Sequence, residues 1–419
     1  MTNELKNVPE LRFSNFCDEW VNYKLGEIVD IRGRIGFRGY TKSDIINKED
    51  GGVLTFSPTN IIYNKLKNTV HDTYITKEKY EESPEIMVKT GDILFVKTGS
   101  TLGKSTLVAN LNEEATVNPQ IAVMRVKVFF HQKFTSTYLT LNKILRQVAQ
   151  TRIGGAIPTL TESEIKKFQV SFPVYEEQQK IGNFFSKLDR QIELEEEKLE
   201  LLEQQKKGYM QKIFSQELRL KDENGNLSPE WTQTQLKNIT NRITRKNKKL
   251  ESTRPLTISG QLGLIDQVEY FNKSVSSKNL ENYTLLQKNE FAYNKSYSNG
   301  YPLGAIKRLT RYDKGVLSSL YICFSISSDI SVDFMQYYFE STKWFREVAS
   351  IAVEGARNHG LLNISVNDFF DISIKLPSLE NQKKISSFLI KIDNLIEKQS
   401  SKVELLKQRK QGLLQKMFI

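Results

Sequence analysis

Cysteine and histidine, two side chains that carry much enzyme chemistry, are scarce in this sequence of 419 residues. Its two cysteines, Cys17 and Cys323, lie far apart, and none of its three histidines, His71, His131 and His359, has a second His or Cys at metal-ligand spacing. None of its ten prolines is adjacent to another, so the Pro-Pro-aromatic loop typical of nucleic-acid methyltransferases is missing. No serine or cysteine lies in a nucleophile-elbow context. We therefore expect neither a catalytic site nor a metal site in this chain.

Long apolar runs are also missing. No run approaches the roughly 20 residues that span a bilayer, and the first residues, MTNELKNVPELRF, lack the layout of a signal peptide. The scarcity of cysteine fits a reducing compartment. We expect a cytoplasmic protein without a membrane anchor.

One segment resembles a phosphate-binding P-loop but is one residue too short to be one. The segment at 99–105 reads GSTLGKS, with three residues between its glycines where the P-loop needs four. We interpret it as a glycine-bearing turn after a strand at 92–97. The side chains able to contact phosphate there are Lys97, Ser100, Thr101 and Lys104.

Positive charge, by contrast, is in excess. Lys and Arg together number 60 against 49 Asp and Glu, which gives a net charge of +11. This surplus favours a polyanionic partner such as nucleic acid, although solubility alone would also account for it.

One segment of the chain occurs twice. The copies run from Pro173 to Phe214 and from Pro377 to Phe418, at a constant offset of 204, and share about 20 of 42 residues without a gap. This period is far longer than a solenoid repeat, so the repeated unit is a whole domain plus its helix. Two copies of one unit predict a pseudo-twofold molecule with two related surfaces.

Both copies predict a long helix with a coiled-coil seam. Apolar side chains recur at alternating spacings of four and three, and each helix begins just after its proline. We expect the two helices to pair antiparallel, because a pseudo-twofold axis would place them so; two independent helices are the alternative. Polar residues interrupt both seams at the same places, Glu195 with Gln399 and Lys206 with Lys410. The predicted seam residues are Ile181, Leu188, Ile192, Leu199, Leu202, Ile385, Ile392, Ile396, Val403 and Leu406.

The globular parts before the helices match only weakly. Both open on a tryptophan, Trp20 and Trp231, and both run through short β-branched strands into helical stretches, which indicates an α+β domain. We predict a recognition domain at 1–172, a long helix at 173–215, a linker at 216–229, a second recognition domain at 230–376 and a long helix at 377–419.

Several loops carry residues suited to nucleic-acid contact. They combine guanidinium or amine groups with glycines that let a backbone approach phosphate, or with amides that can bond base edges; flexible or solvated loops are the alternative interpretation. The candidates in the first domain are Arg32, Arg34, Arg38, Arg152, Gly154 and Gly155. Those in the second are Arg245, Lys246, Asn294, Lys295, Tyr297, Asn299, Tyr301, Arg357, Asn358 and His359.

This layout resembles the DNA specificity subunit of type I restriction–modification systems. Three features carry the resemblance, the Trp-x-x-x-x-Leu openings, the Gly-Asp-Ile-Leu run at 91–94 and the duplicated Pro-x-x-Glu-x-Gln-x-x-Ile helix starts. The second copy departs from the pattern, with Lys-Asn-Glu-Phe at 288–291 in place of Gly-Asp-Ile-Leu and with no obvious Gly-Lys turn.

The resemblance implies a non-catalytic subunit of a larger complex. Each recognition domain would read one half of a bipartite double-stranded DNA target, and the helix pair would set the spacer. Two modification subunits would carry the S-adenosylmethionine chemistry and two restriction subunits the ATP and Mg²⁺ chemistry, so this chain itself would bind no cofactor.

Three alternatives remain open from the sequence. One is a nuclease or methyltransferase with a site hidden in the divergent regions, and another is a protein-binding scaffold whose charge is incidental. The third is the specificity partner of a fused methylase–nuclease.

Overall fold

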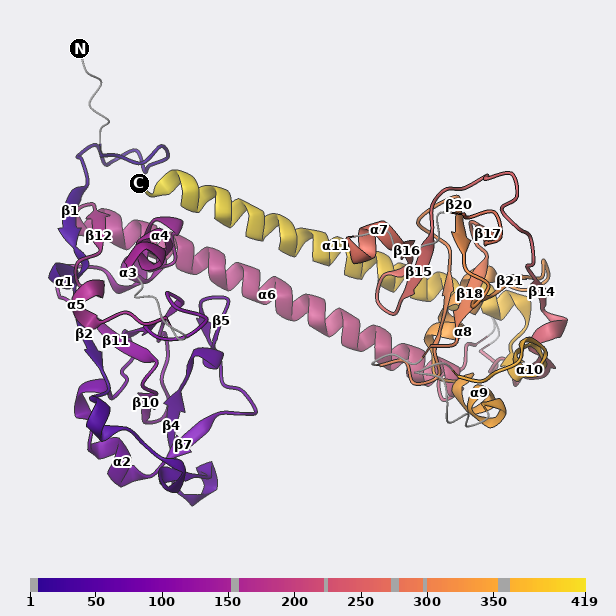
Figure 1. The fold of residues 1–419 in the computed structure, drawn as a ribbon, viewed down its shortest axis with the longest axis horizontal. Coiled ribbons are helices and arrows are strands. Elements are labelled where there is room, and N and C mark those ends of the chain that lie inside the picture. The colour runs from indigo at the N-terminus through magenta and orange to yellow at the C-terminus, as the bar shows by residue number, and fades with distance from the viewer. Residues whose placement is uncertain (1–6, 152–157, 222–224, 273–278, 297–299, 353–361) are drawn as a thin grey trace, which may run out of the picture. The chain divides into compact units, whose positions relative to one another are not determined.

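The computed structural model describes all residues except 1–6, 152–157, 222–224, 273–278, 297–299 and 353–361 (Figure 1). The chain divides into two compact units. Unit 1 comprises Met1–Glu196 and Ser401–Ile419, and unit 2 comprises Glu197–Ser400. Each long helix therefore contributes to both units. The five predicted segment boundaries remain a prediction, since the two units divide the helices along their length.

Unit 1 is an α+β fold around a sheet with strand order β2–β11–β8–β9. These antiparallel strands are Val29–Gly33, Ile121–Val126, Ile93–Val96 and Ser105–Leu107. A second sheet has the order β10–β4–β7–β3, formed by Ala115–Val117, Val53–Phe56, Thr73–Ile75 and Ile45–Ile46. Two further pairs are β1 with β12 (Val21–Lys24, Gln169–Phe172) and β5 with β6 (Ile61–Ile62, Lys65–Leu66). The helices are α1 (Leu25–Ile28), α2 (Lys77–Glu81), α3 (Gln132–Leu139), α4 (Asn142–Thr151) and α5 (Glu162–Ile165).

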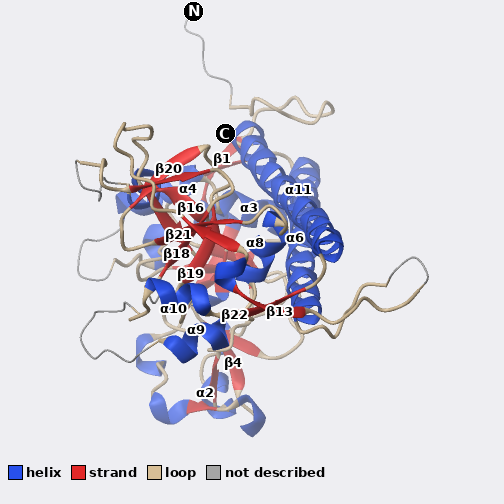
Figure 2. Ribbon diagram, turned by 90° about the vertical axis from the view of Figure 1, so that its right-hand side faces the viewer, coloured by secondary structure: helices blue, strands red, loops and turns tan. Residues whose placement is uncertain are grey.

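Unit 2 repeats this plan, with helix α8 packed along strand β19 (Figure 2). Its main sheet has the order β14–β21–β18–β19, formed by Thr240–Arg242, Ile322–Ile326, Phe291–Asn294 and Ala305–Arg308. The other strand pairs are β15 with β16 (Leu256–Ser259, Gly263–Asp266), β17 with β20 (Thr284–Gln287, Lys314–Leu317) and β13 with β22 (Thr232–Gln235, Ser373–Leu376). The helices are α7 (Gln267–Phe271), α8 (Val332–Glu340), α9 (Phe345–Ile351) and α10 (Val366–Asp371). The predicted α+β class is confirmed.

The two long helices are α6 (Tyr175–Phe214) and α11 (Leu379–Met417). A buried glutamine explains why both begin on the same motif. The Gln178 side chain donates to the Pro173 carbonyl at 2.8 Å and accepts from the His131 amide at 2.9 Å. Gln382 makes the same pair of bonds, to Pro377 at 2.9 Å and from Ser331 at 2.9 Å. Each glutamine thus links the start of a long helix to the residue just before a shorter one, α3 in unit 1 and α8 in unit 2.

The helix segments within unit 1 run antiparallel, as predicted. Lys410 pairs with Asp189 and Lys402 with Glu195, both at 2.5 Å, so residue numbers rise along α6 as they fall along α11. Of the predicted seam residues here, Ile181, Leu188, Ile192 and Val403 are buried and Leu406 is half-buried.

The helix segments within unit 2 show the same pairing. Lys206 bonds Asp393 at 2.7 Å, and Tyr209 packs edge-on against Phe388 with ring centroids 5.1 Å apart. Of the predicted seam residues here, Ile385 and Ile392 are buried and Leu199, Leu202 and Ile396 are half-buried.

These two lysine–aspartate pairs are the same interaction repeated. Lys206 and Lys410 stand 204 residues apart, as do Asp189 and Asp393. The polar interruptions of the seam at Lys206 and Lys410 are therefore partnered positions, each lysine neutralised by an aspartate on the facing helix segment. Such pairs disfavour other registers, because any shift leaves the lysine among apolar side chains.

The hydrophobic core of each unit includes the end of a long helix. In unit 1, Phe418 lies 6.0 Å from the Trp20 ring and stacks on Phe134 at 5.3 Å. In unit 2, Phe214 lies 5.8 Å from the ring of Trp231. The two tryptophans that open the repeat thus have the same role, each packing against a phenylalanine at or just after the end of a long helix.

Candidate nucleic-acid interface

Several predicted contact loops of unit 1 meet at one edge of the main sheet. Strands β2 and β8 both pair antiparallel with β11, so they are parallel to each other and both end beside its first residues. Arg32 near the end of β2 and Lys97 just after β8 are neighbours, because the Lys97 side chain lies over Gly33. The Lys97 carbonyl accepts from the amide of Leu160 at 2.8 Å, which brings the residues around Leu160 to this edge.

The glycine-bearing turn predicted at 99–105 is confirmed. It joins β8 to β9, and both Gly99 (φ +106°) and Gly103 (φ +88°) are in the left-handed region that favours glycine. Ser100 and Lys104 are exposed there, and Thr101 is half-buried.

Unit 2 builds the same edge from different residues. The residue after β18 is Lys295, whose carbonyl accepts from the amide of Leu362 at 2.9 Å, as that of Lys97 accepts from Leu160. Gly304 (φ +75°) precedes β19 as Gly103 (φ +88°) precedes β9. The described residues Lys295 and Gly304, on either side of 297–299, therefore occupy the same places in unit 2 as Lys97 and Gly103 do in unit 1.

The apparent departure of unit 2 from Gly-Asp-Ile-Leu is a one-residue misalignment. Asn289 has φ +72° and donates its amide to Leu309, as Gly91 (φ +95°) donates to Val108. Asparagine tolerates the left-handed region better than other non-glycine residues. Asn289, not Lys288, thus stands in the place of Gly91.

The prediction for Arg34 is wrong. Its side chain is 6% exposed, and its guanidinium donates to the Val117 carbonyl at 3.2 Å and to the Thr116 hydroxyl at 3.3 Å. Burial lowers the pKa of this guanidinium. Arg34 follows β2 directly and turns inward between the two sheets of unit 1, so it is not available to a phosphate.

The other predicted contacts differ in how free their side chains are. Arg32 and Lys246 are exposed, whereas Arg38 donates to the Glu82 carbonyl at 2.9 Å and Arg245 pairs with Glu290 at 2.8 Å. Ile31 in unit 1 and Arg242 in unit 2 occupy the same place in the two main sheets. Arg34 and Arg245 each follow by three residues, so they are equivalent positions as well.

The predicted contacts on the loop after β18 are partly engaged. Asn294 is half-buried and accepts from the Ser296 amide, and the Lys295 amine donates to Ile364 at 3.2 Å. The Tyr301 ring packs against Gly260, and the Lys307 amine lies 5.7 Å above it. The remaining candidates, Arg152, Gly154, Gly155, Tyr297, Asn299, Arg357, Asn358 and His359, lie outside the described residues.

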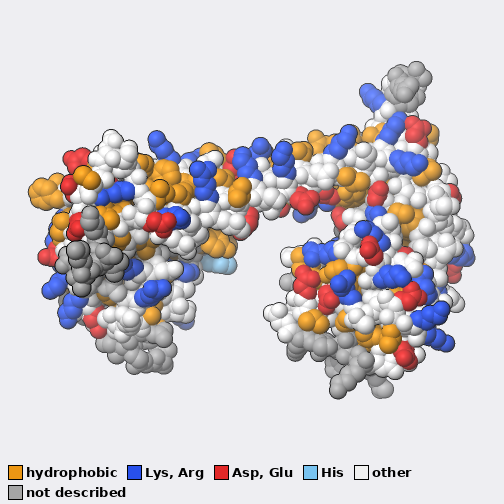
Figure 3. Space-filling model, turned by 90° about the horizontal axis from the view of Figure 1, so that it is seen from above, with side chains coloured by type: hydrophobic (Ala, Val, Ile, Leu, Met, Phe, Trp, Pro, Cys, Tyr) orange, Lys and Arg blue, Asp and Glu red, His pale blue; other side chains and the backbone are white. Residues whose placement is uncertain are grey.

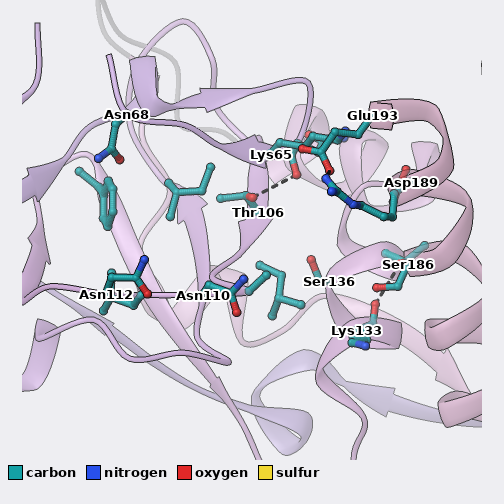
Figure 4. Close-up of a pocket in the computed structure, with 18 of the residues that line it drawn as sticks. Lys65, Asn68, Thr106, Asn110, Asn112, Lys133, Ser136, Ser186, Asp189 and Glu193 are labelled. Atoms are coloured by element: carbon teal, nitrogen blue, oxygen red, sulfur yellow. Dashed lines mark hydrogen bonds and ion pairs between the residues drawn. The ribbon is translucent and has the colours of Figure 1, made fainter. Parts of the chain in front are cut away.

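A groove in unit 1 gathers polar residues that the sequence did not single out (Figure 4). It has a volume of about 840 Å³ and lies between hairpin β5–β6, strand β9, helix α3 and the first half of α6. We call it the amide groove, after Asn64, Asn68, Asn110 and Asn112, which line it. These asparagines come in two pairs, Asn64 and Asn68 on either side of β6 and Asn110 and Asn112 in the loop after β9, and no spacing in the sequence links one pair to the other.

Basic side chains do not form one large patch on the visible surface. On the face in view, Lys and Arg alternate with acidic and apolar side chains over each unit (Figure 3). In the part of the chain that the structure describes, no group of three or more His, Cys, Asp or Glu could hold a metal ion. No helix in that part is long and apolar enough to cross a membrane.

Comparison with known proteins is consistent with this architecture. Residues 17–204 match the model of the type I restriction modification DNA specificity domain. The type I restriction enzyme MjaVIII specificity subunit of Methanocaldococcus jannaschii is 22% identical over 435 residues, which cover 98% of this chain and 95% of that protein. The putative MjaX specificity subunit of the same organism is 22% identical over 244 residues, covering 56% and 55% of the two chains.

Solved structures share the fold. The type I restriction–modification S subunit from M. genitalium superposes with a TM-score of 0.56 at 17% identity, covering 98% of this chain and 99% of that one. A chain from a structure on complex assembly and conformational transition of the type I R-M system gives 0.50 at 15% identity, covering 95% and 97%. The domain match at residues 17–204, the relative of nearly equal length and the shared fold agree, so this chain is similar over nearly its whole length to type I restriction–modification DNA specificity subunits.

Proposed function

We propose that this chain is the sequence-specific DNA-recognition subunit of a type I restriction–modification complex, with each unit reading one half of a bipartite duplex target. The observation that carries the proposal is the duplicated sheet edge. The two units share its framework, including the Lys97 and Lys295 carbonyl bonds, but differ in the loops that the framework presents. A conserved support with two unlike surfaces suits two unlike half-sites.

The long helices suit the role of a spacer. A helix of 40 residues extends about 60 Å at 1.5 Å per residue, and half-sites read from one side of a duplex lie about 34–36 Å apart. Insertion of seven residues into both α6 and α11 should lengthen the gap between the half-sites and leave their bases unchanged. Altered half-sites with an unchanged gap would refute the spacer role.

The chemistry of modification and cleavage would reside on other chains. In this proposal two modification subunits bring S-adenosylmethionine and two restriction subunits bring ATP and Mg²⁺, and the chain itself, acting in the cytoplasm, is not an enzyme. The scarcity of cysteine and histidine and the lack of a recognised catalytic motif in the sequence support this division.

A selection experiment tests the proposal directly. The full chain, assembled with its modification subunits, is used to enrich sequences from a library of randomised duplexes. We expect one bipartite motif with a fixed gap, and binding that weakens steeply as salt rises because phosphate contacts release counterions. Enrichment of no motif would contradict the proposal. Methyl transfer or cleavage by the chain alone, with labelled S-adenosylmethionine or with Mg²⁺ and plasmid, would favour the enzyme alternative.

A further inference from the structure

The charged side chains of the amide groove are balanced. Lys65, Lys133 and Arg190 face Glu113, Asp189 and Glu193 in its lining, three of each sign. Most of them are already paired. Arg190 bonds Glu193 at 2.7 Å, Asp189 bonds Lys410 at 2.5 Å and Glu113 bonds Lys48 at 2.9 Å. The Lys133 amine donates to the Asn183 side chain at 3.2 Å. A groove without surplus positive charge is poorly suited to hold phosphates.

Its asparagines, in contrast, are free to bond a ligand. Asn64, Asn68, Asn110 and Asn112 are exposed, and their side-chain amides bond no other residue in the described ranges. Each amide offers a donor pair and an acceptor. Figure 4 shows Asn68, Asn110 and Asn112 along one side of the groove, opposite Ser136 and Ser186 from α3 and α6.

The hairpin that borders the groove has an unusual turn. Its two loop residues, Tyr63 (φ +50°) and Asn64 (φ +59°), are both left-handed, as a two-residue type I′ turn requires. Asparagine suits such a position, but tyrosine does not. Tyr63 is nevertheless placed at the tip with 95% of its surface exposed. A strained, exposed aromatic ring beside unbonded amides is typical of a recognition surface.

The equivalent site in unit 2 has different chemistry. Thr106 and Leu107 on β9 correspond to Lys307 and Arg308 on β19, because β9 pairs with β8 in the same register as β19 pairs with β18. The cavity there has a volume of about 180 Å³ and is lined by Lys307, Arg308, Gln336 and Glu340 among others. The two units therefore offer an amide surface and a charged surface at the same place.

We propose that the amide groove reads base edges of the half-site bound by unit 1, with Asn68, Asn110 and Asn112 as specificity-determining residues. This inference rests on the proposed function and adds where discrimination occurs. The amide of asparagine matches the donor and acceptor of adenine in the major groove, so the base pairs read here are A·T pairs. Because α6 forms one wall, the long helix also borders the bases rather than acting only as a spacer.

The test is a motif selection with a triple variant, Asn68→Ala, Asn110→Ala and Asn112→Ala, in the full chain assembled with its modification subunits. Asn64 is kept, because its left-handed backbone favours asparagine. The control is Asn394→Ala, which removes an exposed asparagine from α11 in unit 2. The melting temperature of each assembly shows whether the variant is folded.

We expect the triple variant to lose about 5- to 100-fold preference at one or more A·T pairs of a single half-site. The other half-site and the gap should be unchanged, and the control should match the unaltered chain. Unchanged preferences at every position would overturn the inference, as would weaker binding to all sequences alike, which would indicate a positioning role. If the unaltered chain enriches no motif, the proposed function fails instead.

Discussion

At the scale of single residues, two arginines close in sequence have opposite roles. Arg32 is exposed at the sheet edge, and Arg34 is buried with its guanidinium bonded to backbone and hydroxyl oxygens. Sequence alone placed both in one basic loop. The difference arises because Arg34 follows the last residue of β2, where the chain turns between two sheets, and this turn is not visible in the residue pattern.

We predict that Arg32→Ala and Arg34→Ala separate binding from stability. Arg32→Ala should weaken DNA binding to all sequences alike and lower the salt slope by about 1, because one phosphate contact is lost. Arg34→Ala should leave buried acceptors unbonded and cost about 1–3 kcal/mol of unfolding free energy. Binding titrations at several salt concentrations and chemical denaturation measure the two effects. A large stability loss in Arg32→Ala would show that its exposure is misjudged.

The structure gives a reason for the glutamine in the motif at the start of each long helix, which the sequence shows only as a repeated pattern. Gln178 is 2% exposed and makes two bonds that join α6 to the residue before α3. The bond from His131 cannot be inferred from the spacing of the motif, because His131 is 47 residues away in the chain.

Gln178→Ala should destabilise unit 1 by about 1–3 kcal/mol, since it leaves a buried amide and a buried carbonyl without partners. Gln191→Ala is the control, an exposed glutamine on the same helix, and should change stability little. Thermal and denaturant unfolding report both. Equal effects in the two variants would mean that the buried bonds contribute nothing.

At the scale of elements, the helices were the most predictable part of the chain. Their seam repeats over about 40 residues, so period and length were both clear from sequence. The partners of Lys206 and Lys410 were missed, although Asp189 and Asp393 are aligned by the same offset of 204. A search for opposite charges at matching offsets would have found them.

Charge reversal at one of these pairs should be repaired by reversing its partner. Lys410→Glu places a carboxylate beside Asp189 and should cost about 1 kcal/mol, since the pair is only partly buried. Asp189→Lys together with Lys410→Glu should restore most of this loss. A double-mutant cycle on the melting temperature measures the coupling. Additive losses would show that the two groups do not interact.

Charged residues in the seam should loosen the helix pair. Leu199→Asp with Leu202→Asp puts two carboxylates at half-buried seam positions, which is unfavourable without partners. We expect a lower melting temperature and weaker assembly. Leu201→Asp is the control, because that side chain is 54% exposed on the same turns. A control as destabilised as the seam variant would place the seam on another face.

At the scale of the whole molecule, sequence predicted the class of the fold better than its recognition surface. The repeat, the tryptophan openings and the duplicated helix starts were enough to predict two α+β domains, each followed by a long helix, with the two helices paired antiparallel. The amide groove was not predictable, because the Asn64/Asn68 and Asn110/Asn112 pairs come together only where hairpin β5–β6 packs beside β9. The equivalence of Asn289 and Gly91 was missed for a similar reason. The two residues share a left-handed backbone conformation but differ in residue type, so aligning the sequence does not reveal it.

The central claim is that two related units each read their own half of a split target. Replacing residues 30–155 with the corresponding region of another family member, followed by motif selection with the assembled complex, tests it most directly. The account predicts that one half-site changes completely while the other half-site and the gap remain. A change in both half-sites, or in neither, would contradict it.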